Sequence, residues 1–505
     1  MDTKALRQKI LDLAIRGKLV PQDPNDEPAE VLLERIREQK QQMLKEGKLK
    51  KKDIKNDTII FKGEDNLHYE KFQDGTIKCI EDEIPFEVPE GWAWARLRDI
   101  CMMSAGKSKS TDQIKSEPFE GSYPCFGGNG VRGYVDEYNQ DGIFSIVGRQ
   151  GALCGNINIA IGKFYATEHA VVTTLFDGID FKWSNYILEA LRLNNYATGA
   201  AQPGLSVANI LNVFVPVPPT QEQDRIGNNV YESLKIVEAL EQEKIDLQKI
   251  IITAKTKILD LAIRGKLVPQ DPNDEPASVL LERIRTEKEE LIKQGKIKRD
   301  KKESVIFKGD DNSYYLRTGR VEESLEDWRF DDLPETWKIC CLGELCDYGD
   351  CINVNTEDIA EDAWILDLED IEKDTGTVLK KVTKDQRNSV STKHKFHSGQ
   401  VLYSKLRPYL NKVVLSDADG YCTSEILPLE FKNCVLPEYA RYYLMSGTFI
   451  AYANHCSYGV KMPRLGTTDG KKAIFSLPPL SEQKRIVETI DFCFVQLNKI
   501  SEALA

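Results

Sequence analysis

Apolar residues recur at helical spacing through one unbroken stretch, from Gln221 to Gly265. A heptad frame places one apolar stripe along this stretch, through Val230, Val237, Leu240, Leu247, Ile251, Ala254, Ile258 and Leu261. The same frame continues at the two chain ends, through Leu6, Ile10, Leu13, Ile490, Leu497 and Ile500. A helix of about 45 residues would be on the order of 65 Å long. The pattern therefore predicts a long paired helix; the alternative is a core helix inside one globular domain.

Much of this pattern occurs twice. The sequence KILDLAIRGKLVPQDPNDEPA runs from Lys9 and again, letter for letter, from Lys257, and both copies continue as VLLERIR after one substitution. Near the other end of each copy, PPTQEQDRI from Pro218 matches PPLSEQKRI from Pro478. A match of this length indicates a tandem duplication, and repeats determine the architecture of a chain.

The duplication relates the two chain ends to the central helix. The second half of that helix matches the N-terminus and its first half matches the C-terminus, so that Met1 corresponds to Lys249 and Ala505 corresponds to Ile245. We expect the two ends to be the halves of a second long helix, antiparallel to the central one. The chain would then be a circularly closed, pseudo-two-fold arrangement of two units, 1–248 and 249–505.

The segments between the long helices carry other patterns. Pro28 can begin a second helix that stops at Gly47. The basic segments that follow, 48–55 and its counterpart 296–302, are either solvated linkers or arms that touch phosphates. From Ile84 onward, alternating apolar residues interrupted by glycine favour a twisted sheet.

This sheet pattern is followed by a helix in each copy, from Asn185 to Leu193 and from Pro437 to Met445. The predicted fold class is α+β, with two globular mixed α/β domains separated by two long antiparallel helices. The predicted segments are 1–83 (half of the split helix, repeat helix and basic linker), 84–220 (first domain), 221–327 (central helix, repeat helix and linker), 328–480 (second domain) and 481–505 (the other half of the split helix).

Composition narrows the class of protein. With 505 residues, of which 41% are hydrophobic, the chain is long enough for two or more domains. It has no run of 18 apolar residues and no apolar segment near its N-terminus, so we expect a cytoplasmic protein. The net charge of −12 indicates that any contact with DNA is confined to local patches.

Signals for catalysis or metal binding are missing from the sequence. It contains no NPPY or NPPF motif for adenine methylation, no GxxxxGK[ST] loop for ATP and no CxxC pair among its 12 cysteines. We therefore expect no catalytic, cofactor-binding or metal-binding residues, and reduced, mostly buried thiols. The phrase FGGNG at 126–130 resembles a cofactor-binding glycine motif, but we favour a glycine turn between strands, which needs no cofactor.

The strongest candidates for DNA contact are Arg149 and Gln150. They lie where a predicted strand ends in a turn flanked by glycine, a place from which Arg can contact guanine and Gln can contact adenine. Lys405 and Arg407 occupy the matching place in the second domain. Weaker candidates are Lys107, Lys109, Arg132, Lys163, His169 and Gln202 in the first domain and Lys412, Lys461, Arg464, Lys471 and Lys472 in the second.

In the order of its motifs the whole chain resembles the DNA specificity subunit of a type I restriction-modification system, often called HsdS. The motifs are the duplicated helices, the PPxxEQxRI sequence before each long helix, and the phrases YPCFGGNGVRGYV and YATEHAVV. The resemblance implies two target recognition domains that each read one half of a bipartite, asymmetric double-stranded DNA sequence, with the helices setting the spacing.

The resemblance also implies partners. Two methyltransferase subunits would dock on the helices and methylate adenine with S-adenosylmethionine, and two motor-nuclease subunits would join with ATP and Mg. The chain itself would be a non-catalytic recognition subunit without a cofactor. Two alternatives are an adaptor that binds protein or glycan and a stand-alone DNA-modifying enzyme. Salt-dependent binding to duplex DNA, and S-adenosylmethionine turnover by the isolated chain, distinguish these three.

Overall fold

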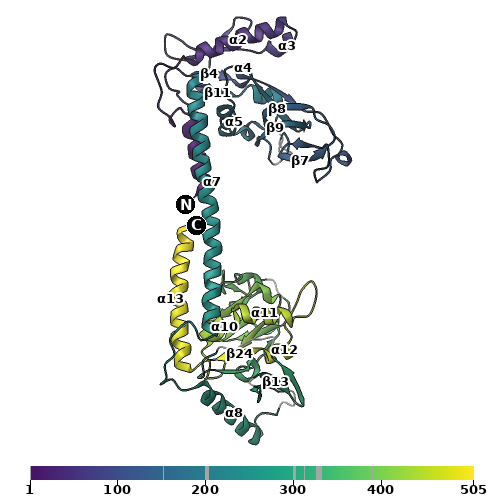
Figure 1. Ribbon diagram of the computed structural model, residues 1–505, viewed down its shortest axis with the longest axis vertical. Helices are drawn as coiled ribbons and strands as arrows, with labels where there is room; N and C mark the ends of the chain where they lie inside the picture. Colours follow the sequence, from purple (N-terminus) through teal and green to yellow (C-terminus); the bar gives the residue numbers. More distant parts are fainter. Residues whose placement is uncertain are drawn as a thin grey trace. The chain divides into compact units, whose positions relative to one another are not determined.

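The computed structural model describes residues 2–151, 153–198, 204–299, 303–311, 313–325, 333–387 and 390–504. The chain divides into two compact units, Met1–Lys244 and Ile245–Ala505, and each unit combines helices with small sheets. In Figure 1 the purple-to-blue part of the ribbon belongs to unit 1 and the green-to-yellow part to unit 2. The molecule is a mixed α/β protein with two repeated domains, as the sequence predicted.

Unit 1 places its helices around three sheets. Strands β1 (Ile59–Lys62), β2 (His68–Lys71) and β3 (Ile77–Cys79) form one antiparallel sheet, and β4 (Ala93–Arg96) pairs with β11 (Phe214–Val217). The largest sheet has the order β5-β10-β8-β9-β6-β7. Its strands are β5 (Cys101–Ala105), β6 (Tyr123–Gly127), β7 (Gly130–Val135), β8 (Gln140–Gly148), β9 (Ile157–Ala166) and β10 (Ala170–Leu175). The helices are α1 (Thr3–Ile15), α2 (Ala29–Lys45), α3 (Lys51–Ile54), α4 (Leu97–Ile100), α5 (Phe181–Ala190), α6 (Val207–Leu211) and the first part of α7 (Thr220–Ile263).

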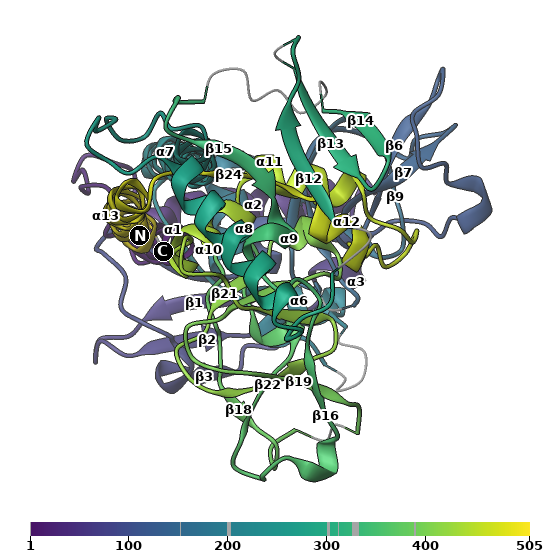
Figure 2. The same cartoon turned by 90° about the horizontal axis from the view of Figure 1, so that it is seen from below.

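Unit 2 repeats the outer parts of this plan and changes the central sheets. Its helices after α7 are α8 (Ala277–Lys293), α9 (Leu342–Leu345), α10 (Pro437–Leu444), α11 (Gly447–His455), α12 (Thr467–Lys472) and α13 (Leu480–Leu504). Figure 2 shows β12 (Ser304–Lys308), β13 (Tyr314–Thr318) and β14 (Val321–Ser324) side by side as an antiparallel sheet, and β15 (Lys338–Cys341) pairs with β24 (Ile474–Leu477).

Two further sheets replace the large sheet of unit 1. One has the order β16-β19-β22-β17-β18 and the other the order β21-β20-β23. Their strands are β16 (Ile352–Val354), β17 (Trp364–Leu366), β18 (Val382–Thr383), β19 (Lys393–Phe396), β20 (Val401–Ser404), β21 (Val413–Leu415), β22 (Gly420–Thr423) and β23 (Ile426–Leu429). The predicted helix at 437–445 coincides with α10, whereas the helix predicted at 185–193 begins earlier, as α5.

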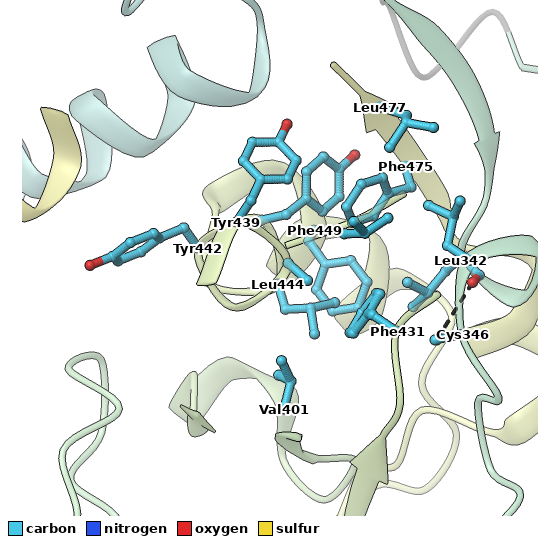
Figure 3. Close-up of a cluster of buried hydrophobic side chains, with 14 of the residues drawn as sticks. Leu342, Cys346, Val401, Phe431, Tyr439, Tyr442, Leu444, Phe449, Phe475 and Leu477 are labelled. Carbon is cyan, nitrogen blue, oxygen red and sulfur yellow. Dashed lines mark hydrogen bonds between the residues drawn. The ribbon is translucent and has the colours of Figure 1, made fainter. Parts of the chain in front are cut away.

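Aromatic side chains fill the core of unit 2. The rings of Tyr443 and Phe475 are stacked with centroids 4.1 Å apart, and Phe449 meets Tyr443 edge-on. The Tyr439 hydroxyl donates a hydrogen bond of 3.1 Å to the carbonyl oxygen of Ser476. Figure 3 shows Tyr439 of α10 and Phe449 of α11 in one cluster with Phe475 on β24. The buried hydroxyls thus bind backbone oxygens at the strand, which fixes the helix pair against the sheet.

The EQ motif before each long helix forms a joint between scaffold and domain. Glu222 accepts hydrogen bonds from the Trp92 indole (2.9 Å) and from the Gln22 amide (3.1 Å). Gln223 donates to the carbonyl oxygen of Pro218 and accepts from the backbone N–H of Asp180. The second unit repeats these bonds with Glu482, Trp337, Gln270, Gln483 and Leu436. The repeated motif therefore has a structural role in both units.

A glycine closes the same joint in each unit. Gly17 follows α1 with φ of 62°, and a Cβ atom there would lie 2.4 Å from Cγ of Pro89. Gly265 follows α7 with φ of 65°, and a Cβ atom there would lie 2.5 Å from Cγ of Pro334. Both the left-handed backbone and the close approach exclude a larger residue, so these glycines end the helices at the predicted places.

The helix α7 is continuous over 44 residues, close to the predicted stretch. Within unit 1 the Arg7 guanidinium on α1 lies 3.9 Å from Glu238 on α7. Within unit 2 the Lys255 ammonium on α7 donates to Asn498 on α13 at 2.6 Å. Because Lys255 corresponds to Arg7 in the duplication, both units pair α7 with a terminal helix in the same register. The antiparallel closure of the two ends remains a prediction.

The predicted stripe residues differ in burial. Those that lie in a core are Val230, Val237, Ile251, Ile10 and Ile490. Those that are half-buried are Leu240, Ala254, Ile258, Leu261, Leu13 and Leu497. Those that are exposed are Leu247, Leu6 and Ile500. Buried residues that the frame did not include are Ile226, Leu234, Leu259, Ala262, Leu11 and Ala14. The stripe is broader than a strict heptad seam because α1 and α7 also pack on the domain beside them.

Candidate nucleic-acid interface

Arg149 and Lys405 end equivalent strands of the two units. The Arg149 N–H donates to the carbonyl oxygen of His169 at 3.1 Å, and the Lys405 N–H donates to that of Glu425 at 3.0 Å. The carbonyl oxygen of Arg149 accepts from the Leu205 N–H at 2.8 Å, and that of Lys405 accepts from the Leu465 N–H at 3.0 Å. The sequence-based pairing of these two positions therefore has a structural basis in backbone hydrogen bonds.

A third loop completes the arrangement in each unit. Thr198 and Gly204 exchange backbone hydrogen bonds of 2.9 Å, and Tyr458 and Arg464 do the same at 3.1 and 3.0 Å. Gly204 also bridges to Gln150, as Arg464 bridges to Leu406. We call the strand end, the turn at 169 or 425, and this loop the loop frame of each unit. Equivalent backbone hydrogen bonds hold the loop frame of each unit.

A cleft of about 530 Å³ opens beside the loop frame of unit 1. It is lined by Gly127, Gly128, Asn129, Gly130, Val131, Arg132, Gln150, Gly151 and His169. Glycine is required here, because a Cβ atom on Gly148 would lie 1.9 Å from the carbonyl oxygen of Gly128. The FGGNG phrase is the turn between β6 and β7. The predicted residues Arg132, Gln150 and His169 thus meet at one hollow.

Polar side chains surround this cleft. Arg132 is exposed and donates to the Thr111 hydroxyl at 3.0 Å. His169 lies 3.6 Å from Glu168. Asn129 accepts a hydrogen bond from Asn156 at 2.8 Å; sequence reasoning did not single out either amide, although Asn129 lies inside the glycine phrase. Such amides and guanidinium groups can bind base edges or phosphates.

The other predicted residues of unit 1 lie in different environments. Lys107 is exposed after β5. The Lys109 side chain is only 9% exposed, and its ammonium binds Glu137 at 2.7 Å over the Tyr165 ring. Its hydrogen bond to Glu137 raises the pKa of Lys109 above the ordinary value. The ammonium of Lys163, which lies on β9, is 4.7 Å from the centre of the Tyr138 ring. Gln202 lies outside the described residues.

Unit 2 binds several of its predicted cations internally. Arg464 makes hydrogen bonds of 2.9 to 3.1 Å to both carboxylate oxygens of Glu425, and this pairing raises its pKa. The Lys412 ammonium donates to the carbonyl oxygen of Leu368 at 2.6 Å, and burial lowers its pKa. Arg407 has φ of 50° at the base of the loop frame. Arg464 and Lys412 are therefore held by the protein itself.

The remaining cations of unit 2 are more open. Lys461 is exposed at the tip of the loop that Tyr458 and Arg464 close. Lys471 lies 3.9 Å from Asp350, and Lys472 lies 4.0 Å from Glu323. These last two lie on α12, beside α9 rather than in the loop frame.

Within the described residues no group of three or more His, Cys, Asp or Glu side chains could hold a metal ion. Burial raises the pKa of Cys340, Cys341 and Cys346, which keeps these thiols in the neutral form. No helix in the described part of the chain is long and apolar enough to cross a membrane.

Comparisons with known proteins identify the family of the chain. A family model described as "Type I restriction modification DNA specificity domain" matches residues 89–254 and 334–503, once in each repeat and together more than half of the chain. The type I restriction enzyme EcoAI specificity subunit of Escherichia coli is 28% identical over 577 aligned positions, which cover 98% of this chain and 90% of that protein.

Other similarities are more local or more remote. The EcoprrI specificity subunit of E. coli is 45% identical over 151 positions, which cover 29% of this chain and 36% of that protein. The HsdS subunit from Thermoanaerobacter tengcongensis shares 15% identity at a TM-score of 0.45, over 83% of this chain and 93% of that one. On the family match in both repeats, the chain belongs to the type I restriction-modification DNA specificity subunits.

Proposed function

We propose that each unit reads one half of a bipartite, asymmetric DNA target. The observation that carries this proposal is that the two loop frames have equivalent backbone hydrogen bonds but present different side chains. Unit 1 presents Arg149, Gln150 and His169, whereas unit 2 has Lys405, Leu406 and Glu425 at the same positions. Equal backbones with unequal side chains suit two half-sites of different sequence.

In unit 1 we assign Arg149 and Gln150 to base contact. Both follow β8 at the rim of the loop frame, and within the described residues Arg149 makes no ion pair that would occupy its guanidinium. Arg can bind guanine and Gln can bind adenine with two hydrogen bonds each. Arg132 and His169, which line the same cleft as Gln150, would bind phosphate or a neighbouring base.

In unit 2 we assign Lys405 to the corresponding contact and Lys461 to a phosphate. Arg464 would orient the loop through Glu425 instead of binding DNA. Because the whole chain carries a net charge of −12, these local cations must supply the attraction for phosphate. Binding should therefore weaken steeply as the salt concentration rises.

We further propose that the duplicated scaffold docks two adenine methyltransferase subunits. The letters from Lys9 to Ala29 recur unchanged from Lys257 to Ala277, and both copies form the same joints. Two equal surfaces suit two copies of one partner. S-adenosylmethionine would bind to these subunits, and ATP and Mg to two motor-nuclease subunits. The helix α7 would set the number of unspecified base pairs between the half-sites.

Two matched variants test the proposal, Arg149→Ala and Lys405→Ala, each co-expressed with the cognate methyltransferase. Binding is measured to target duplexes in which either half-site is scrambled. We expect Arg149→Ala to lower the ratio of affinities for the intact and the scrambled first half-site by about 10- to 100-fold, without changing this ratio for the second half-site. Lys405→Ala should lower the ratio for the second half-site alone. Lys71→Ala, at the exposed last residue of strand β2, serves as the control. If both variants affect the same half-site, the assignment of one half-site to each unit is wrong.

A further inference from the structure

The loop between α11 and α12 in unit 2 carries an apolar tip. Val460 is fully exposed, and Tyr458 and Met462 on either side are 62% and 46% exposed. Exposed apolar side chains are common singly, but three in one short loop form an apolar surface that no described residue covers. We call residues 458–464 the finger.

The finger is held firmly at its base. Tyr458 and Arg464 close it by two backbone hydrogen bonds, and the Arg407 N–H donates to the carbonyl oxygen of Pro463 at 2.7 Å. The Arg464 guanidinium donates hydrogen bonds to both carboxylate oxygens of Glu425. Gly459 has φ of 98°, and a Cβ atom there would lie 3.2 Å from the carbonyl oxygen of Met462. The tip is therefore presented on a fixed support, which lowers the entropic cost of binding.

Two lysines flank the finger. Lys461 lies at the tip, and Lys405 lies at the base, where its carbonyl oxygen accepts a hydrogen bond of 3.0 Å from the Leu465 N–H. Neither ammonium has an ion pair among the described residues. An exposed apolar side chain next to a cation suits the floor of a DNA major groove, where phosphates line the walls and thymine methyl groups lie on the floor.

We propose that Val460 reads a thymine by apolar contact with its methyl group, in the half-site that unit 2 recognises. This inference rests on the proposed function and adds the chemical class of the target. Unit 2 has Leu406 at the position of Gln150, and a leucine side chain cannot form hydrogen bonds to a base. An apolar contact by Val460 would give unit 2 another way to discriminate bases. The sequence of unit 1 has the same spacing of Gly and Pro in this loop, with Ala200 at the position of Val460.

Deoxyuridine provides a direct probe, because it lacks only the methyl group of thymine. The purified complex with its methyltransferase is tested on target duplexes in which each thymine of the second half-site is replaced in turn. We expect one replacement to weaken binding by the wild type about 3- to 10-fold. Val460→Ala should lose a similar factor on the natural duplex and be insensitive to that replacement.

Val321→Ala, an exposed valine on β14 of the same unit, is the control. Because Val460 is fully exposed, its variant should keep the wild-type melting temperature. If no thymine replacement matters, or if the factors for Val460→Ala and deoxyuridine simply multiply, the inference is wrong while the proposed function stands. Loss of methyltransferase co-purification by Val460→Ala would instead assign the finger to a protein contact. A wild-type complex without any bipartite preference would overturn the proposed function itself.

Discussion

Whether a lysine or arginine side chain can bind DNA depends on the hydrogen bonds and ion pairs that it already forms within the protein. Arg464 is bound by Glu425, Lys109 by Glu137 and Lys412 by a backbone oxygen. To reach a phosphate, each would first give up a charge-assisted hydrogen bond, which is the stronger kind. Arg149 and Lys461 have no ion pair within the described residues, so they can bind DNA at lower cost.

A buried carboxyl in unit 1 makes folding depend on pH. Asp99 accepts the Arg96 N–H at 2.9 Å and lies 4.0 Å from the Lys40 ammonium, which binds Asp57 more closely. Burial raises the pKa of Asp99 from its ordinary 3.8 to about 6. The folded state therefore holds this proton more tightly than the unfolded state does. The stability that Asp99 contributes is present below pH 3.8 and is lost as the pH rises through about 6.

The Asp99→Asn variant tests this dependence. Between pH 4 and 7 its free energy of unfolding should improve relative to the wild type by roughly 2–4 kcal/mol, because the amide has no charge to bury. Urea unfolding at a series of pH values measures the difference. Asp112→Asn, at an exposed turn, should show no such trend. A difference for Asp99→Asn that stays flat across this range would contradict the assigned cause.

Sequence could locate some of these residues and not others. Arg149 and Lys405 were predicted as a pair, because a glycine-flanked strand end is visible in the letters. The partners Glu137 and Glu425 were not visible, since they lie 28 residues from Lys109 and 39 residues from Arg464 and reach them only after the strands pair. The cleft in unit 1 depends on the contact of Gly128 with Gly148, which likewise needs the tertiary fold.

At the scale of elements, the long helix follows directly from its period. A run of apolar residues at helical spacing, closed by Gly265, specifies α7 without any tertiary information. The small sheets β1–β3 and β12–β14 were missed, and their region was assigned to a basic linker. The sequence does contain a hairpin signal, since Asp74 and Gly75 form a typical turn sequence between two short strands. The lysines nearby led to the prediction of a linker instead.

The proposed spacer role of α7 can be tested by its length. Inserting one heptad after Lys244 adds about 10 Å of helix. We expect the gap between the half-sites to grow by about three base pairs, or the methyltransferase to stop co-purifying. Lys244→Ala, which keeps the length, is the control. An inserted chain that still modifies sites with the original gap would show that α7 does not set the spacing.

At the scale of the whole molecule, the duplication separates what is shared from what differs. The joints around Glu222 and Glu482 repeat bond for bond, whereas the central sheets have different strand orders. Shared joints would let one domain be replaced while the other keeps its support. Sequence predicted the two repeated domains because the scaffold letters repeat; the differing sheets carry few common letters, so their topology could not be inferred by analogy.

Exchange of residues 90–215 for the matching domain of a relative tests this modularity. We expect the modified target to change in one half only, because Gln22, Glu222 and Gln223, the scaffold side of the joint, lie outside the exchanged residues. The other half and the gap should stay as in the wild type, which serves as the reference in the same cells. A change in both halves would show that the units do not read independently.

The most direct measurement is a genome-wide map of modified adenines in cells that co-express this chain and its cognate methyltransferase. Single-molecule sequencing reports each modified site together with its flanking bases. The account predicts one asymmetric, bipartite motif with a fixed gap. Modification by a co-purifying methyltransferase without sequence preference would contradict recognition by the two units, and failure of the two proteins to co-purify would contradict the docking scaffold.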